Sequence, residues 1–457
     1  MNEKNIIPVC GYTPPPNGYI CIDGVCEKKY ESFQTKERYA EYRECGFDEI
    51  LFAGEDKYTG EPFETSRLKK MLDLAAETNL KAIVFDERII SLTVRAQKSI
   101  VAELYGGDEA AFYGYVQDCL GAYIGHGAFY GVSVIDEPKH FKSGVISEIT
   151  AALKRGAAAY GKDCFAMTCF LPCVQDLGLA SDAFGAGFAN VYEAYEDYAK
   201  KMGAAIGYFH YDCYPFGFWE GKNVVCRAFV RNMQTAVKAA QKAGVPFHFT
   251  AQSFSSGAQN ELRQLDFCDL AWQINLALGF GVKKVYYFTY WRFTTRTGHH
   301  FTSAIMNDDG SRNIYNEVQA ANRLLQNSAR YVYGFEWQKS QLLQGEYTGN
   351  GGNECAADIL SENIGLIESH RADEPVLFNV LKRGAQGENG EETAMYFLNL
   401  GDPYEKRVNR VHIALKKGVL NSSAAMIRGG EKTEIRIENG EIDLALAPGE
   451  AVWILKK

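Results

Sequence analysis

Eight short apolar segments, separated by stretches with helical periodicity, constrain the fold of this chain more than any other feature. They begin about 40 residues apart. Their near-continuous apolar character is typical of parallel strands that are buried on both faces of a sheet. The segments begin near Ile6, Asp48, Lys81, Ala128, Cys164, Ala205, Val245 and Lys283.

The stretches between these segments are predicted to be amphipathic helices. In residues 67–76 and 228–237, apolar side chains recur every three or four positions. Several stretches end at a glycine just before the next apolar segment, and glycine readily adopts the left-handed conformation that ends a helix. These glycines are Gly46, Gly161, Gly203, Gly244 and Gly281.

This alternation predicts an α/β fold, with eight parallel strands closed into a (β/α)8 TIM barrel ringed by helices. The alternative is an open doubly wound sheet, which has roughly five or six strands and often a glycine-rich turn after the first one. Here the first apolar segment leads into residues 12–16, Tyr-Thr-Pro-Pro-Pro, which cannot cradle a phosphate group. The sequence therefore favours the barrel.

The pattern changes after about residue 335, where helical periodicity stops. Short stretches of alternating apolar and polar residues follow, separated by turn signals such as Asn-Gly and Pro-Gly. They lie at residues 394–400, 410–415, 435–437 and 451–455. This texture predicts a C-terminal antiparallel β-sandwich. We therefore predict two domains, a catalytic barrel over residues 1–335 and a β-sandwich domain over residues 336–457.

Composition and charge exclude several classes of partner. The 48 basic and 57 acidic residues give a net charge of −9, which disfavours binding to a phosphate backbone and so predicts no nucleic-acid partner. No apolar run approaches the roughly 18–20 residues that span a bilayer, so no membrane association is expected. The N-terminus lacks the long apolar segment of a signal peptide, which favours a cytoplasmic location.

The 12 cysteines are scattered, and most lie in apolar segments, as reduced buried thiols do. One pair differs, because residues 19–26 read as a hairpin with Asp-Gly at its turn. Cys21 and Cys26 would face each other across that hairpin, and the spacing permits a disulfide. The sequence leaves open whether that disulfide forms.

The predicted strands end in carboxylates and aromatic residues. Active sites of TIM barrels lie at the C-terminal ends of the strands, because the loops there converge. An acidic, aromatic-lined mouth suits acid–base chemistry on a glycosidic oxygen and contact with sugar rings. The strand ends read Glu55-Asp56, Asp86-Glu87-Arg88, Asp136-Glu137-Pro138, Asp212-Cys213-Tyr214, Ala251-Gln252-Ser253 and Tyr290-Trp291-Arg292.

Two of these stretches carry a family resemblance. The Asp136-Glu137-Pro138 strand end resembles the strand-4 signature of (β/α)8 glycoside hydrolases of the large retaining clan. Residues 287–292 (Tyr-Phe-Thr-Tyr-Trp-Arg) and 307–312 (Asn-Asp-Asp-Gly-Ser-Arg) are similar to the strand-8 region of family 42 β-galactosidases. The resemblance implies that Glu137 is the general acid/base and that the C-terminal sandwich is an accessory domain.

The chain departs from that clan at strand 7, where the clan places its nucleophilic glutamate. The matching residue here is Gln252, whose neutral amide cannot form a glycosyl ester. Three explanations stay open. The enzyme inverts configuration, with Asp212 or another carboxylate activating water; a 2-acetamido group of the substrate is the nucleophile, oriented by Asp136; or the barrel binds sugars without cleaving them, or Gln252 is an inactivating substitution.

From these features we predict a glycoside hydrolase acting on a small glycoside or oligosaccharide. Glu137 protonates the leaving oxygen, and Asp212, or after it Asp136, is the second carboxylate. No metal or organic cofactor is implied, and a homo-oligomer stays open. A lyase or isomerase on the same barrel and a non-catalytic carbohydrate-binding barrel are the alternatives. Predicted substrate contacts are Gln252, Tyr290, Trp291, Tyr214, Trp219, Asp86 and Arg292.

Overall fold

The computed structural model describes most of the chain. It covers residues 5–22, 25–28, 31–52, 56–173, 177–219, 221–226, 228–257, 261–292, 300–346, 356, 358–384, 392–420 and 422–456.

Eight parallel strands form one sheet in the order β7-β6-β5-β4-β1-β13-β11-β8. A bridge between Phe170 and Tyr211 links the two outermost strands, and the Phe170 N–H donates a 2.8 Å hydrogen bond to the His210 carbonyl. The sheet therefore closes into a barrel, which confirms the predicted fold class. The strands are β1 (Val9–Tyr12), β4 (Glu49–Leu51), β5 (Lys81–Val84), β6 (Phe129–Asp136), β7 (Phe165–Cys169), β8 (Phe209–Asp212), β11 (Phe247–Gln252) and β13 (Lys284–Phe288).

The barrel interior is a packed core. Cys10, Leu51, Ile83, Met167 and Tyr286, from five different strands, form one buried cluster inside it. A buried ion pair between Lys284 and Glu49 lies at the strand starts, at the end of the barrel opposite the predicted site. Because side chains fill the barrel, chemistry with a substrate is confined to its rim.

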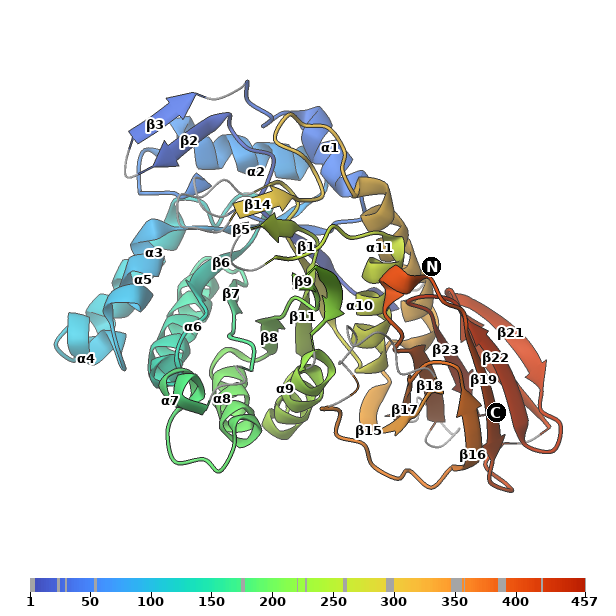
Figure 1. Ribbon diagram of the computed structural model, residues 1–457. Coiled ribbons are helices and arrows are strands. Elements are labelled where there is room, and N and C mark those ends of the chain that lie inside the picture. Colours follow the sequence, from blue (N-terminus) through green and yellow to red (C-terminus); the bar gives the residue numbers. More distant parts are fainter. Residues whose placement is uncertain are drawn as a thin grey trace.

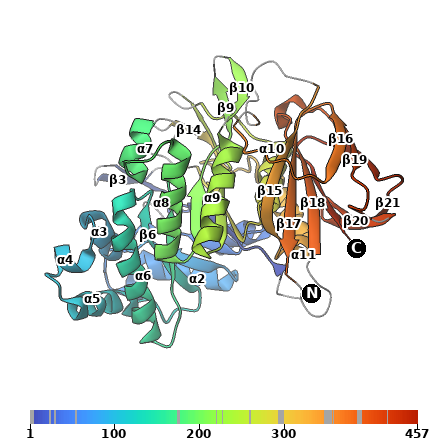
Figure 2. The same cartoon turned by 90° about the horizontal axis from the view of Figure 1, so that it is seen from below.

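Helices surround the barrel, as Figures 1 and 2 show. Figure 2 shows α6, α8 and α9 side by side along one flank. The helices are α1 (Lys36–Glu44), α2 (Arg67–Glu77), α3 (Glu87–Arg95), α4 (Ile100–Leu104), α5 (Glu109–Gly121), α6 (Ser143–Ala158), α7 (Leu177–Phe184), α8 (Val191–Ile206), α9 (Phe229–Ala243), α10 (Phe267–Gly279) and α11 (Tyr315–Val332).

Glycines end most of the predicted helices, with one correction. Gly244 follows α9 with a φ of 68°, a left-handed conformation that costs glycine nothing. Gly203 does not end its helix. It lies inside α8 on the face that packs against Val245 and Phe209, and Gly207, with a φ of 96°, ends the helix instead.

Three short antiparallel strand pairs among the described residues lie outside the barrel sheet. Strands β2 (Tyr19–Ile22) and β3 (Val25–Lys28) form the predicted N-terminal hairpin, and its register pairs the backbones of Cys21 and Cys26. The side chains of both cysteines lie outside the described part of the chain, so their disulfide stays untested. Strands β9 (Phe216–Trp219) and β10 (Lys222–Val225) form a second hairpin. Strand β12 (Ser255–Gly257) follows β11, strand β14 (His300–Ser303) follows β13, and the two pair with each other in antiparallel fashion.

Two antiparallel sheets follow the barrel. One has the order β15-β17-β18-β23-β20-β21 and the other β16-β19-β22, and a separate apolar cluster is buried among their strands. The predicted division at residue 335 falls between α11 and β15. The strands are β15 (Glu336–Leu343), β16 (Ile367–Ala372), β17 (Val376–Arg383), β18 (Glu392–Asn399), β19 (Asn409–Leu415), β20 (Ser423–Arg428), β21 (Glu431–Arg436), β22 (Glu441–Leu446) and β23 (Ala451–Leu455).

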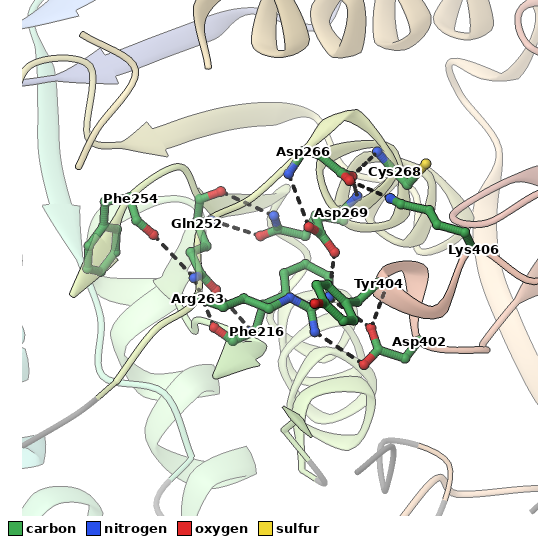
Figure 3. Close-up of polar contacts among 11 residues, drawn as sticks. Phe216, Gln252, Phe254, Arg263, Asp266, Cys268, Asp269, Asp402, Tyr404 and Lys406 are labelled. Carbon is green, nitrogen blue, oxygen red and sulfur yellow. Dashed lines mark hydrogen bonds and ion pairs between the residues drawn. The ribbon is translucent and has the colours of Figure 1, made fainter. Parts of the chain in front are cut away.

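Polar contacts join the antiparallel sheets to the barrel through α10 and the segment before it (Figure 3). The guanidinium of Arg263 donates to Asp269, at 2.5 Å, and to Asp402 of the C-terminal region, at 2.8 Å. The Tyr396 hydroxyl donates a 2.6 Å bond to the Asn275 carbonyl. Since Arg263 and Asp269 are both buried, these contacts are held away from water and tie the two parts together.

Candidate active site

The carboxylates predicted at the barrel mouth come from two strands. Asp136 is the last residue of β6, Glu137 follows it directly, and Asp212 is the last residue of β8. Because both strands run parallel in one barrel, their ends meet at the same rim. The charges of Asp212 and Asp136 act on the neighbouring carboxyl groups at this rim.

The backbone of Glu137 is strained. Its φ of 43° lies in the left-handed region, which residues with a β-carbon rarely adopt. The Glu137 N–H donates a 2.9 Å bond to the Cys169 carbonyl of the next strand, and the Tyr198 hydroxyl donates a 2.7 Å bond to the carbonyl of Pro138. These two hydrogen bonds stabilise the left-handed conformation of Glu137. The regular alternation of side chains along β6 ends at this residue. Such strain gathers at functional sites, where it orients a side chain.

Asp212 is held by a hydrogen bond on one side. The Tyr214 hydroxyl donates a 2.7 Å bond to Oδ2 of Asp212, and the neighbouring Cys169 thiol also favours the charged form and lowers the pKa of this carboxylate. Oδ1 is buried and has no hydrogen-bond partner among the described residues. Desolvation raises the pKa of Asp212 above its ordinary value, and Tyr214 and Cys169 act against that rise.

Asp136 and Glu137 are exposed to solvent, yet the surrounding strand ends remove enough water to perturb both groups. Desolvation and then the charge of Asp212 raise the pKa of Asp136 to about 7. Desolvation, then Asp212 and then Asp136 raise the pKa of Glu137 to about 7. Three crowded carboxyl groups therefore favour a state that keeps at least one proton near neutral pH, which supplies a proton donor beside an anion.

Aromatic rings line the same rim. Tyr12 ends β1, Phe288 ends β13, and their ring centroids are 5.5 Å apart. The ring of Tyr214 lies 6.1 Å from Phe288 and 4.9 Å from Phe254. Tyr12, Tyr214 and Phe288 are partly exposed, and the charges of Asp136 and Asp212 contribute to a raised pKa of the Tyr12 phenol, after desolvation. Partly exposed rings beside carboxylates suit contact with a sugar.

Tyr12, Cys169 and Phe288 were not singled out from the sequence. The rule that strand ends line the site would have selected all three, because each is the last residue of its strand. The two strand-8 aromatics that were predicted instead, Tyr290 and Trp291, lie just beyond the strand. Both are buried: Tyr290 packs on Tyr42 and Phe47, and Trp291 packs on Phe33. We therefore do not retain them as sugar contacts.

The side chain of Gln252 is held by hydrogen bonds within the protein (Figure 3). Its side chain is 0% exposed. The amide Nε2 donates to the carbonyls of Phe216 and Phe254, at 3.1 and 3.3 Å, and Oε1 accepts a 3.0 Å bond from the Phe216 N–H. Both amide hydrogens are thus used inside the protein, so Gln252 clamps the start of β9 and is not retained as a sugar contact.

The remaining predicted substrate contacts are Asp86, Arg292 and Trp219. The first two are paired with other side chains of the protein, and the side chain of the third is not among those that the structure describes. Asp86 is 0% exposed, caps α3, and accepts bonds from Arg88 and from the Tyr123 hydroxyl. Arg292 is paired with Asp308. The backbone of Trp219 ends β9, whereas its side chain lies outside the described part of the chain. Of the predicted contacts with a described side chain, Tyr214 alone lies beside the carboxylates.

Asp56, predicted at the end of the second strand, has a structural partner of its own. Asp56 is buried and accepts a 3.1 Å bond from Gln34, and Glu55 lies outside the described residues.

Within the described ranges, no group of three or more His, Cys, Asp or Glu side chains is arranged to hold a metal ion. None of the described helices combines the length and apolar character that a membrane crossing requires.

Two solved structures are similar to this chain over nearly its whole length, and a third is similar over part of it. One, a glycoside hydrolase, is similar with a TM-score of 0.52 at 10% identity, over 99% of this chain and 93% of the other. The α-amylase from Anoxybacillus is similar with a TM-score of 0.50 at 12% identity, over 99% of this chain and 98% of the other. A β-galactosidase from Marinomonas ef1 has a TM-score of 0.47 at 10% identity, over 71% of this chain and 60% of that enzyme's length.

No protein-family model and no curated protein matches the sequence. What the solved structures show is the fold, an eight-stranded TIM barrel followed by antiparallel sheets. A fold does not fix a reaction, so the activity is argued from the carboxylates at the barrel rim.

Proposed function

We propose that this protein is a glycoside hydrolase acting on a small glycoside or oligosaccharide. The observation that carries the proposal is the cluster of Asp136, Glu137 and Asp212 at one barrel rim, with the pKa of Glu137 raised to about 7. A carboxylic acid that keeps its proton near neutral pH is the group needed to protonate a glycosidic oxygen. The neighbouring anion stabilises the positive charge that develops on the sugar.

In the proposed reaction Glu137 is the general acid and Asp212 the second carboxylate. Tyr214 donates to Oδ2 of Asp212, whereas Oδ1 has no hydrogen-bond partner among the described residues and would accept a proton from an attacking water or face the anomeric carbon. Asp136 is the alternative second carboxylate. It would orient a 2-acetamido group of the substrate, so that the acetamido oxygen attacks in place of a protein nucleophile.

The proposal assigns no nucleophile to strand 7. In family 42 and its clan a glutamate occupies that position. Here the side-chain amide of Gln252 is hydrogen-bonded to the backbone of Phe216. Tyr12, Tyr214 and Phe288 are the proposed walls for the sugar ring, and Trp219 of the β9–β10 hairpin stays a proposed contact.

The test is turnover of a panel of aryl glycosides, 2-acetamido sugars included, by the wild-type protein and by Glu137→Gln. Wild-type turnover that falls about 100-fold or more in the variant supports the proposal. Glu109→Gln, at an exposed position on α5, is the matched control and should leave turnover unchanged. Undiminished turnover in Glu137→Gln, or sugar binding with no product by mass spectrometry, contradicts it. Proton NMR of the first-formed anomer then separates retention from inversion.

A further inference from the structure

Two cysteines meet beside the candidate site. Cys213 follows Asp212 directly, and Cys226 lies at the other side of the β9–β10 hairpin, just before α9. The Cys226 N–H donates a 2.7 Å bond to the Pro215 carbonyl, which extends the pairing of Phe216 with Val225 by one rung at the hairpin base. Each thiol is the first cause of the pKa shift of the other, as expected for neighbouring sulfur atoms that share a proton. The hairpin thus brings two residues together that are distant in the sequence.

The surroundings of the two thiols differ in a way that separates their chemical roles. The Cys213 thiol and the N–H groups of Ala228 and Phe229 stabilise the Cys226 thiolate and lower its pKa to about 7. The pKa of Cys213 is raised, because its proton is held by Cys226 and the site is desolvated. Both residues are partly exposed, whereas Cys164 and Cys173 are buried and have raised pKa values.

We propose that Cys213 and Cys226 form a reversible intramolecular disulfide when the protein meets a hydroperoxide. The Cys226 thiolate attacks the O–O bond of the peroxide, forming an S–O bond and releasing hydroxide, which takes a proton to become water. The Cys213 sulfur then attacks the sulfenic acid at Cys226, forming the S–S bond, and the departing hydroxyl leaves as a second water with the Cys213 proton. Two thiols lose two electrons, and one hydrogen peroxide becomes two waters.

The link would lock the base of the β9–β10 hairpin against the strand end that carries Asp212. Cys213 stands between Asp212 and Tyr214, whose 2.7 Å hydrogen bond holds the second carboxylate. A disulfide at Cys213 therefore changes the backbone between these two residues. This consequence for turnover rests on the proposed function, whereas the disulfide itself does not, so the two are measured separately.

The disulfide is tested by peptide mapping of the full chain. The protein is treated with hydrogen peroxide, free thiols are alkylated, and trypsin cleaves after Lys222, which separates the two cysteines. The expected product is residues 202–222 joined to 223–227, which a thiol reductant separates again. Peroxide-treated protein in which both peptides are fully alkylated overturns the proposal. A disulfide that forms without any loss of aryl-glycoside turnover overturns only the consequence for activity.

Single variants separate the attacking thiol from the resolving one. In Cys213→Ser, the sulfenic acid at Cys226 cannot be resolved and should be trapped by dimedone, whereas Cys226→Ser should give no adduct at Cys213. Iodoacetamide at pH 7 should modify Cys226 about tenfold faster than Cys268, a partly exposed thiol whose pKa is raised. Cys268→Ser is the matched control and should keep the 213–226 link. Absence of the dimedone adduct in Cys213→Ser, or equal alkylation rates, overturns the assignment of Cys226.

Discussion

The hydroxyl of Tyr214 donates a 2.7 Å hydrogen bond to Oδ2 of Asp212, two residues earlier on the same strand end. The other carboxylate oxygen, Oδ1, is buried without a hydrogen-bond partner among the described residues. The phenol therefore fixes the orientation of the carboxylate, and the proposed mechanism uses the other oxygen. It also favours the anion, since hydrogen bonding to the charged form lowers the pKa of Asp212 against the opposing effect of desolvation.

Replacing Tyr214 by phenylalanine should impair the second carboxylate without removing it. The loss of the donor leaves Oδ2 less well solvated, so the pKa of Asp212 rises and a smaller fraction is ionised at neutral pH. Turnover of an aryl glycoside at pH 7 should fall about 10- to 100-fold. The acidic limb of the pH–rate profile, which reports ionisation of Asp212, should move to higher pH.

The control for this variant is Tyr195→Phe. The Tyr195 hydroxyl is buried and has no hydrogen-bond partner among the described residues, so its removal breaks no polar contact. This variant should keep both the rate and the pH profile of the wild-type protein. A Tyr214→Phe enzyme with an unshifted acidic limb would remove Asp212 from the proposed mechanism.

The raised pKa of Asp136 predicts that this residue destabilises the protein above neutral pH. An aspartate has a pKa of about 3.9 in an unfolded chain, and about 7 in the folded protein. The folded state therefore holds a proton that the unfolded state has released, and the associated stability is present below pH 4 and lost as the pH rises to about 7. Asp136→Asn, which does not titrate, should show no such loss from this site.

Thermal unfolding of Asp136→Asn and the wild-type protein at several pH values tests this sign. The two should unfold at similar temperatures at pH 4, and the variant should be more stable by about 1 kcal/mol at pH 8, because partial exposure screens part of the effect. The exposed Asp118 on α5 supplies the control, and Asp118→Asn should track the wild-type protein at both pH values. An advantage that is larger at pH 4 than at pH 8 would show that the sign is wrong.

The barrel and the position of its carboxylates were predictable because they follow from local patterns. Parallel strands buried on both faces are apolar throughout, so a charged pair such as Asp136-Glu137 marks a strand end without ambiguity. Parallel strands also share one direction, so Asp212 had to emerge at the same rim. These inferences need only the order of residues along each strand.

The sequence did not predict which of several neighbouring side chains lies at the barrel rim and which is buried. Phe288 ends β13 and is partly exposed, whereas Tyr290 lies two residues beyond the strand and is buried. Packing of the segment after the strand, and not the strand pattern, decides which aromatic ring reaches the rim. The role of Asp86 was equally hidden, because its partners Arg88 and Tyr123 satisfy it only once α3 and α5 have packed. Burial and pairing of this kind depend on tertiary contacts.

The hydrogen bonds of Gln252 predict that restoring a glutamate at strand 7 harms the protein. Nε2 now donates to the carbonyls of Phe216 and Phe254, and a carboxylate there would place negative charge against two acceptors in a site that water does not reach. Gln252→Glu should lower the free energy of unfolding by about 2–4 kcal/mol at pH 7, measured with urea. The loss should shrink at pH 5, where the carboxyl group is more easily protonated.

Gln338 on β15 provides the exposed counterpart, and Gln338→Glu should change stability by less than about 0.5 kcal/mol. Turnover should not rise in Gln252→Glu, because the residue is held against β9 and not turned toward a substrate. A variant that is as stable as the wild-type protein and gains turnover would instead mean that strand 7 does supply the nucleophile and that Gln252 is an inactivating substitution.

The ion pair of Lys284 with Glu49, at the end of the barrel opposite the site, should have a large and pH-dependent effect on stability. Both side chains are buried, and desolvation raises the pKa of Glu49 although the lysine opposes it. Lys284→Met keeps the apolar stem but leaves the carboxylate unpaired, which should cost about 3–5 kcal/mol at pH 8. The cost should fall toward pH 5, since a protonated Glu49 carries no charge.

The double variant Lys284→Met/Glu49→Gln should recover most of the loss in urea unfolding. A double variant as unstable as Lys284→Met alone would mean that packing of the lysine stem, and not the unpaired charge, sets the cost.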